Sequence, residues 1–203
     1  MTQVYDDKGQ RVAVTAIALG PCVVTQRKSS EKDGYDSVQV AFGETTERRV
    51  TKPALGHFKK AETTPKRHLR EFAVGEGEEI AMGETLTTDV FENVSHVDIT
   101  AVSKGRGFQG VVKRHGMAGG RKSHGGGGPR RVGAIGQCAY PGRVARGRAM
   151  PGHMGNRRVT TQNLRVVTID AEKNLMLING AIPGPTGAIV EVRKALKKAS
   201  KGA

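Results

Sequence analysis

Residues 99–169 read ITAVSKGRGFQGVVKRHGMAGGRKSHGGGGPRRVGAIGQCAYPGRVARGRAMPGHMGNRRVTTQNLRVVTI and contain no aspartate or glutamate. This stretch holds 14 of the 33 Lys/Arg in the chain, whereas everything outside it holds 19 Lys/Arg and 19 Asp/Glu. The formal net charge of +14 therefore belongs to this one stretch, which we call the acid-free run. A segment that repels itself needs negative charge from outside, and a phosphate backbone is the densest biological source. The sequence therefore predicts a polyanionic partner.

Most of the acid-free run lacks the residues needed for a core of its own. Residues 103–157 hold 16 glycines and 12 Lys/Arg, but only six members of the Leu, Ile, Val and Phe types. Ordering one residue costs about 1–2 kcal/mol of backbone entropy, and one buried apolar side chain returns about 1.5–3 kcal/mol. Six such side chains cannot offset that cost over the whole of this segment. We expect an extension that is poorly ordered alone and becomes ordered on its partner.

The sequence on both sides of the extension has the alternating apolar pattern of β-strands. Clear alternation occurs at residues 12–17, 37–42 and 97–102, and residues 158–169 and 175–178 predict a hairpin around a turn at 170–174. A last strand is expected at 187–192, and the best helix candidate is a short segment at 53–60. Many short strands with few helices predict a mainly β fold, an antiparallel barrel or sandwich.

The predicted organisation has four parts. Residues 1–98 form the first part of the β-barrel with small insertions, and residues 99–157 form the basic extension. Residues 158–192 supply the remaining strands, and residues 193–203 form a basic tail. The tail is expected to be either a frayed, solvated helix or a second contact, through Arg193, Lys194, Lys197, Lys198 and Lys201.

The composition argues against several classes of protein. Cys22 and Cys138 are the only cysteines and form no CxxC or Cys/His cluster, which argues against a zinc site or a disulfide framework. The N-terminus lacks an apolar signal segment, and no continuous apolar run is long enough to suggest a membrane span. The scarcity of Phe and Tyr and the absence of Trp argue against a reader of single strands by base stacking. We expect a cytoplasmic protein with no membrane, metal, cofactor or small-molecule substrate.

Two patterns suggest enzymes, and neither is complete. GRGFQG (105–110) has the GxGxxG spacing of a dinucleotide site, but the residues after it are a poor helix start. No acidic residue lies about 20 positions further on to bind a ribose hydroxyl. His115, His124 and His153 have no carboxylate in the region to orient them, so a hydrolase site is not expected. The sequence therefore predicts no catalytic residues.

The candidate binding residues are the cations of the extension and of its junction with the next strand. Glycine lets the backbone lie close to a nucleic-acid surface, and the arginine fork binds phosphate through two N–H groups. Eleven of the 14 cations in the acid-free run are arginines. The candidates are Lys104, Arg106, Lys113, Arg114, Arg121, Lys122, Arg130, Arg131, Arg143, Arg146, Arg148, Arg157 and Arg158.

Several segments, taken in order, resemble the bacterial form of the ribosomal protein L3 family. They are SKGRGFQGVVKR (103–114), GAIGQ (133–137), PGRV (141–144), PGHMG (151–155) and RVT (158–160), together with TKP (51–53) and GHF (56–58). The resemblance implies a translation-protein-type β-barrel with a long extension that enters large-subunit rRNA toward the peptidyl transferase centre. It also implies a non-enzymatic protein that binds rRNA directly, supports early subunit assembly and contacts neighbouring large-subunit proteins.

The same resemblance places the tip of the extension at Gln137, Cys138 and Ala139. Some bacterial members carry a methylated glutamine where this chain has Ala139, so that modification is not expected. Family members usually have a longer first strand before the position of Met1, so this strand is expected to be short. Two rival interpretations are an architectural DNA-binding protein and an RNA-modifying enzyme; the second requires a carboxylate or cofactor pocket that the sequence does not reveal.

Overall fold

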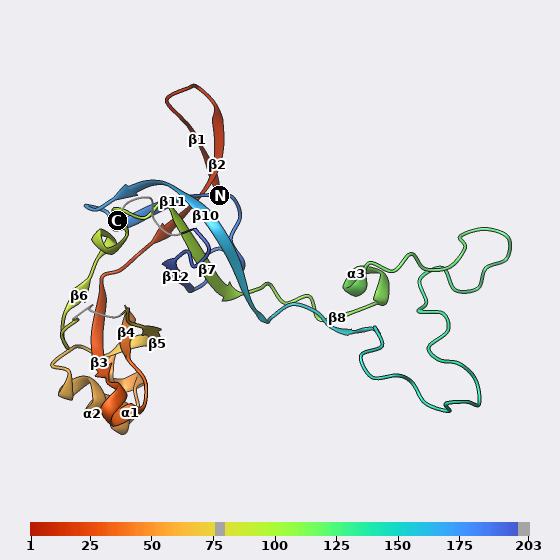
Figure 1. Ribbon diagram of the computed structural model, residues 1–203, viewed down its shortest axis with the longest axis horizontal. Coiled ribbons are helices and arrows are strands. Elements are labelled where there is room, and N and C mark those ends of the chain that lie inside the picture. The colour runs from red at the N-terminus through yellow and green to blue at the C-terminus, as the bar shows by residue number, and fades with distance from the viewer. Residues whose placement is uncertain (76–79, 199–203) are drawn as a thin grey trace. The chain divides into compact units, whose positions relative to one another are not determined.

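The computed structural model describes residues 1–75 and 80–198 and is mainly β-structure (Figure 1). Its strands are β1 (Thr2–Tyr5), β2 (Arg11–Ala18), β3 (Cys22–Lys28), β4 (Ser37–Glu44), β5 (Lys66–Ala73), β6 (Thr85–Leu86), β7 (His96–Val102), β8 (Phe108–Gln109), β9 (Gly152–His153), β10 (Arg158–Asp170), β11 (Leu175–Asn179) and β12 (Val190–Lys194). Its helices are α1 (Ser30–Asp33), α2 (Lys52–Lys60) and α3 (Val111–His115), with 3-10 turns η1 (Glu47–Arg49) and η2 (Thr88–Phe91).

The largest sheet has six strands in the order β1-β2-β11-β10-β7-β12. Its core contains five fully buried apolar side chains: Val14, Val97, Ile99, Met176 and Ile178. The predicted hairpin is confirmed, because β10 pairs antiparallel with β11. Strand β7 is flanked by β10 and β12, and all of its residues from Val97 to Ala101 are buried. The alternating pattern of β7 predicts a strand with one buried and one exposed face, but the structure buries both faces of this strand.

The mainly β, antiparallel class expected from the sequence is confirmed. Among residues 1–75 and 80–198 no closed barrel is detected. Closure of the strands into a translation-protein-type barrel therefore stays a prediction, and so does the long inserted extension.

Asp98 is a buried carboxylate on the central strand β7, only 3% exposed. Its Oδ1 accepts a hydrogen bond from the backbone N–H of Asn163 at 2.8 Å, and its Oδ2 accepts one from the backbone N–H of Leu196 at 3.4 Å. A buried carboxylate is costly unless it is hydrogen-bonded. These bonds therefore satisfy both carboxyl oxygens of Asp98 while they tie β7 to β10 and to the segment that follows β12.

A second sheet of four strands has the order β5-β4-β3-β6. Val24, Val38 and Val40 form its buried core, and Cys22 and Phe72 pack against them. The strand predicted at residues 37–42 is confirmed as β4, and the helix predicted at 53–60 is confirmed as α2. Burial raises the pKa of the Cys22 thiol, which favours its protonated, unreactive form.

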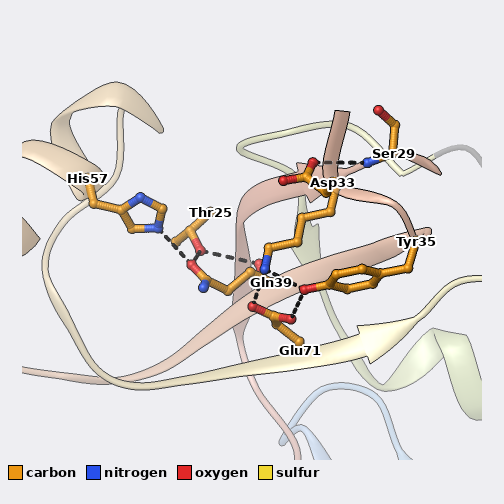
Figure 2. Close-up of polar contacts among 8 residues, drawn as sticks. Thr25, Ser29, Asp33, Tyr35, Gln39, His57 and Glu71 are labelled. Carbon is orange, nitrogen blue, oxygen red and sulfur yellow. Dashed lines mark hydrogen bonds and ion pairs between the residues drawn. The ribbon is translucent and has the colours of Figure 1, made fainter. Parts of the chain in front are cut away.

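Two polar clusters fasten the elements around this sheet (Figure 2). In one, Gln39 Oε1 lies 2.7 Å from His57 Nε2 of α2 and accepts a hydrogen bond from Thr25 Oγ1 at 2.9 Å. In the other, Lys28 Nζ donates to Glu71 Oε1 and to the Tyr35 hydroxyl, both at 2.7 Å. The Tyr35 hydroxyl donates in turn to Glu71 Oε2 at 3.0 Å. The first cluster holds α2 against β3 and β4, and the second links β3 to β5.

Three details differ from the sequence-based expectations. The last strand, expected at 187–192, is β12 at Val190–Lys194, so Arg193 and Lys194 belong to a strand and not to a frayed helix. Lys197 and Lys198 follow in a bend, and Lys201 lies outside the described residues. Helix α3 forms at Val111–His115, where the sequence offered a poor helix start.

The chain divides into two compact units. One comprises Met1–Asp98, Gln162–Ala181 and Arg193–Ala203; the other comprises Ile99–Thr161 and Ile182–Val192. We call the second one the basic unit, and residues 103–157 within it the arm. The four-part organisation expected from the sequence, with boundaries after residues 98, 157 and 192, stays a prediction.

We predict that Glu71→Gln lowers the midpoint of thermal unfolding at pH 7. The hydrogen bond from Lys28, followed by that from Tyr35, holds the pKa of Glu71 below its ordinary value of 4.5. A lowered folded pKa stabilises the protein above the ordinary value, and this stability is lost as the pH falls through the folded pKa. The difference between wild type and variant should therefore shrink below pH 4.5. Calorimetry from pH 7 to pH 3 checks this, with Glu31→Gln as the exposed control; a difference that persists at pH 3 contradicts it.

Candidate nucleic-acid interface

The arm begins as two segments held side by side by backbone hydrogen bonds. The N–H of Ser103 donates to the carbonyl of Arg157, and the N–H of Arg106 donates to the carbonyl of Met154, both at 2.9 Å. Strands β8 and β9 then pair antiparallel. These contacts form the stem of the arm (Figure 1).

Some of the arm's glycines allow its own segments to approach closely. Gly155 has φ of +76°, and a Cβ there would lie 2.0 Å from the carbonyl oxygen of Lys104. Gly119 has φ of +78°, and a Cβ there would lie 2.2 Å from the carbonyl oxygen of Pro129. No larger side chain fits at either position unless the backbone moves. Glycine at these two positions is therefore required by close contacts between segments of the arm itself, and not only by an approach to a partner.

Helix α3 is held at the end of the stem by one buried apolar side chain and by two polar contacts. Val111 is 2% exposed, which gives this five-residue helix a buried anchor. Arg114 Nη1 donates to the carbonyl of Met150 at 2.7 Å, and His115 Nε2 lies 3.0 Å from the same oxygen. The helix follows GRGFQG, but it is short, and the acid-free run supplies no carboxylate for a ribose. A dinucleotide site therefore remains unsupported.

Beyond the stem, residues 116–151 form loops without helix or strand. A hydrogen bond from the N–H of Gly120 to the carbonyl of Pro129 closes one loop at 3.1 Å. Arg148 Nη2 donates to the carbonyl of Ala134 at 2.6 Å. Among the arm's six apolar residues counted above, only Val111 is fully buried, and Phe108 is 75% exposed. Little apolar surface is therefore buried within the arm, and an arm that is poorly ordered alone and ordered by its partner stays a prediction.

The candidate cations lie on the surface of the basic unit. Arg114 is half-buried, and the other twelve are exposed. Three have partners within the chain: Arg114 and Arg148 in the arm, and Arg158, whose Nη2 lies 2.5 Å from Glu191 Oε2. In the described part of the chain, the side chains of the remaining ten make no hydrogen bond or ion pair: Lys104, Arg106, Lys113, Arg121, Lys122, Arg130, Arg131, Arg143, Arg146 and Arg157.

The basic unit is strongly positive because all thirteen candidate cations lie in it, together with only one acidic residue. That acid, Glu191, is already paired with Arg158. The cations of the arm therefore have no counterions within their own unit. Such an array attracts phosphate groups and releases the ions condensed around them.

The predicted tip residues Gln137, Cys138 and Ala139 lie in an exposed loop. Cys138 has φ of 44°, in the left-handed region that non-glycine residues seldom adopt. The next residue, Tyr140, is 91% exposed and was missed by the sequence reasoning. A tyrosine ring this exposed can stack on a base, and the signal in the sequence was a single aromatic residue within a basic, glycine-rich loop.

The enzyme interpretations gain no support. Within residues 1–75 and 80–198 no group of three His, Cys, Asp or Glu side chains is placed to hold a metal ion. His115 contacts a backbone carbonyl, and His153 lies opposite Phe108 in the pairing of β8 with β9.

None of the described helices has the length and apolar character needed to cross a lipid bilayer.

Comparison with known proteins identifies the family. Residues 28–175 match the family Ribosomal protein L3. The chain is 52% identical over 198 residues to large ribosomal subunit protein uL3 of Corynebacterium jeikeium, covering 97% of this chain and 91% of that protein. It is 53% identical over 200 residues to uL3 of Streptomyces coelicolor, covering 98% and 94%. It is 49% identical over 198 residues to uL3 of Alkaliphilus metalliredigens, covering 98% and 94%. The chain therefore belongs to the ribosomal protein L3 family, whose members are structural, non-enzymatic components of the large ribosomal subunit.

Proposed function

We propose that this chain binds large-subunit rRNA directly through its arm and that this binding supports early assembly of the subunit. The observation that carries the proposal is the set of ten exposed cations without partners in the described chain, on a segment that has no carboxylate. Phosphate contacts from such side chains position a protein on RNA without reading its sequence.

The energetics of the arm favour binding and ordering as one event. Few of the arm's apolar side chains are buried, so little in the free chain compensates for the entropy cost of fixing its loops. Phosphates of the RNA supply the missing counterions, and contacts with the RNA surface can order the loops. An arm of this composition suits the interior of an RNA, where anionic groups surround it.

The resemblance to the family supports a more specific placement. In this proposal the loop at Gln137, Cys138 and Ala139 lies toward the peptidyl transferase centre, and Tyr140 stacks on an rRNA base. Neighbouring large-subunit proteins contact the remaining surface, and the protein functions within cytoplasmic ribosomes. The exposure of all four of these residues is what such a tip requires.

The first test is the salt dependence of binding. If about half of the 14 cations in the acid-free run neutralise duplex phosphates, the logarithm of the association constant falls against the logarithm of salt concentration with a slope near roughly −6. Filter binding of the full chain to transcribed large-subunit rRNA measures that slope. A slope shallower than about −2 contradicts the mechanism. Equal competition by duplex DNA would instead favour an architectural DNA-binding protein.

The second test removes charge from the arm without touching its internal bonds. The fourfold variant Arg130→Gln, Arg131→Gln, Arg143→Gln and Arg146→Gln should make the slope shallower by roughly 2 to 4, according to whether two or all four of them contact phosphates. The double variant Lys8→Gln with Arg11→Gln is the control, because these exposed cations lie on or next to the β1–β2 hairpin, outside the basic unit. If the control reduces the slope as much per charge as the arm variant does, the contacts are not specific to the arm.

Arg114 has a different role from the exposed cations, because its guanidinium is directed at a backbone carbonyl of the arm. Arg114→Lys keeps the charge but loses the planar fork, and one such hydrogen bond is worth about 0.5–1.5 kcal/mol. We predict that amide hydrogen exchange in the stem, near residues 106–109 and 152–154, accelerates roughly two- to tenfold. Arg106→Lys, at an exposed side chain, should leave that exchange unchanged. Equal effects of the two variants would show that Arg114 does not brace the stem.

A further inference from the structure

Helix α2 presents a lysine-rich face to solvent. Lys52, Pro53, Gly56, Lys59 and Lys60 are all exposed. Because an α-helix turns once in about 3.6 residues, these positions share one side of the helix. In the described chain, none of the three lysines makes a hydrogen bond or ion pair through its ammonium group.

The opposite side of α2 is fastened to the protein. Phe58 is 2% exposed, and Ala61, directly after the helix, is 4% exposed. His57 Nε2 lies 2.7 Å from Gln39 Oε1, and this contact joins the helix to β4 (Figure 2). In the segment GHF (56–58), histidine and phenylalanine therefore have internal partners. These internal partners do not explain why position 56 is a glycine.

Gly56 has no internal reason to be glycine. Its φ is not positive, and a Cβ at this position would meet no atom within 4 Å. Glycine is among the poorest helix formers, and here it occupies the middle of a nine-residue helix. Gly155 differs, because a Cβ there would collide with the chain's own backbone. A solvent-facing helical glycine without an internal role indicates that something outside the protein approaches the backbone closely.

The charge around α2 points to the chemistry of that partner. Residues 48–70 hold eight Lys/Arg and one acidic residue, Glu62, whereas the rest of the segment 1–98 holds five Lys/Arg and fifteen Asp/Glu. The near-neutral net charge of residues 1–98 therefore hides a segregated positive segment. Partial burial, followed by the charges of Arg67 and Arg70, lowers the pKa of His68 on β5, in keeping with a positive potential there.

We propose that the exposed face of α2 is a second RNA-contact surface, on which a sugar–phosphate backbone lies against Gly56 between the ammonium groups of Lys52, Lys59 and Lys60. The partner class is duplex RNA, and this step rests on the proposed function. An acidic protein fits less well, because the face offers only Pro53 as an apolar group and no aromatic anchor. The surface is separate in sequence from the arm and uses lysine as a point charge.

The decisive variant is Gly56→Ala. If glycine is needed for the fold, alanine lowers the midpoint of thermal unfolding; if glycine is needed only for the contact, alanine raises that midpoint and weakens rRNA binding. Alanine should raise the midpoint of thermal unfolding by roughly 1–4 °C, since it favours the helix and meets no atom. The same methyl group should raise the dissociation constant for transcribed large-subunit rRNA by roughly fivefold or more, the equivalent of one lost contact. An unchanged dissociation constant overturns the inference, and so does weaker binding that accompanies a lower unfolding midpoint.

A paired charge variant tests the same surface independently. Lys59→Ala with Lys60→Ala should make the salt slope of rRNA binding shallower by roughly 2. Lys8→Ala with Lys32→Ala, two exposed lysines outside residues 48–70, is the matched control and should change the slope by less than roughly 1. Equal changes in the two pairs overturn the inference, because the effect would then reflect net charge alone.

The arm variants separate this inference from the proposed function. If the fourfold arm variant weakens rRNA binding while both α2 variants leave it intact, only the second surface is rejected. If neither set weakens binding, direct rRNA binding itself fails. If the α2 variants bind free rRNA normally but are not incorporated into large subunits, the face docks a protein, and the RNA assignment is overturned.

Discussion

Electrostatic repulsion among the cations of the arm, which contains no carboxylate, is the constraint on which the rest of this structure depends. A chain segment of this kind gains little from collapse, so the core must come from the strands before and after it. Those strands meet in the six-stranded sheet, where β7 leads into the arm and β10 leads out of it. Hydrogen bonds hold the stem of the arm together, with Val111 as its main apolar contact. Beyond the stem the candidate cations are all exposed, and that exposure leaves their charge available to a partner.

The few acidic groups near the base of the arm are already engaged. Asp98 accepts two backbone hydrogen bonds within the sheet, and Glu191 pairs with Arg158. Neither carboxylate remains to neutralise the outer cations. Arg114 and Arg148 also have internal partners, but these are backbone carbonyls, so both side chains keep their positive charge while they shape the arm. The basic unit thus uses some cations to hold its own form and leaves the side chains of the others without a partner in the described chain.

Local patterns in the sequence predicted the strands whose alternation is clear, such as β4 and the β10–β11 hairpin, and the short helix α2. They did not predict β5, where four charged residues obscure the alternation, or β3, where a register shift between Val24 and Gln26 interrupts it. Helix α3 was missed because its stability comes from the burial of Val111 and from the bond between Arg114 and Met150, which are 36 positions apart. Counting charges found the cations of the candidate site. It could not separate Arg114, Arg148 and Arg158 from the others, because a backbone carbonyl or a distant acid leaves no mark beside them in the sequence.

The same limit explains why the surface on α2 emerged only from the structure. Net charge averaged over residues 1–98 is slightly negative, and that average conceals eight cations within residues 48–70. A phosphate backbone responds to charge over distances near the Debye length of about 10 Å, so the local density matters more than the sum over a domain. The role of a glycine also depends on its local surroundings and not on the glycine content of the chain. The structure assigns Gly155 to close packing within the chain, whereas a Cβ at Gly56 would meet no atom within 4 Å. A helical glycine of the second kind, set among unpaired lysines, is best explained by a contact that the isolated chain does not contain.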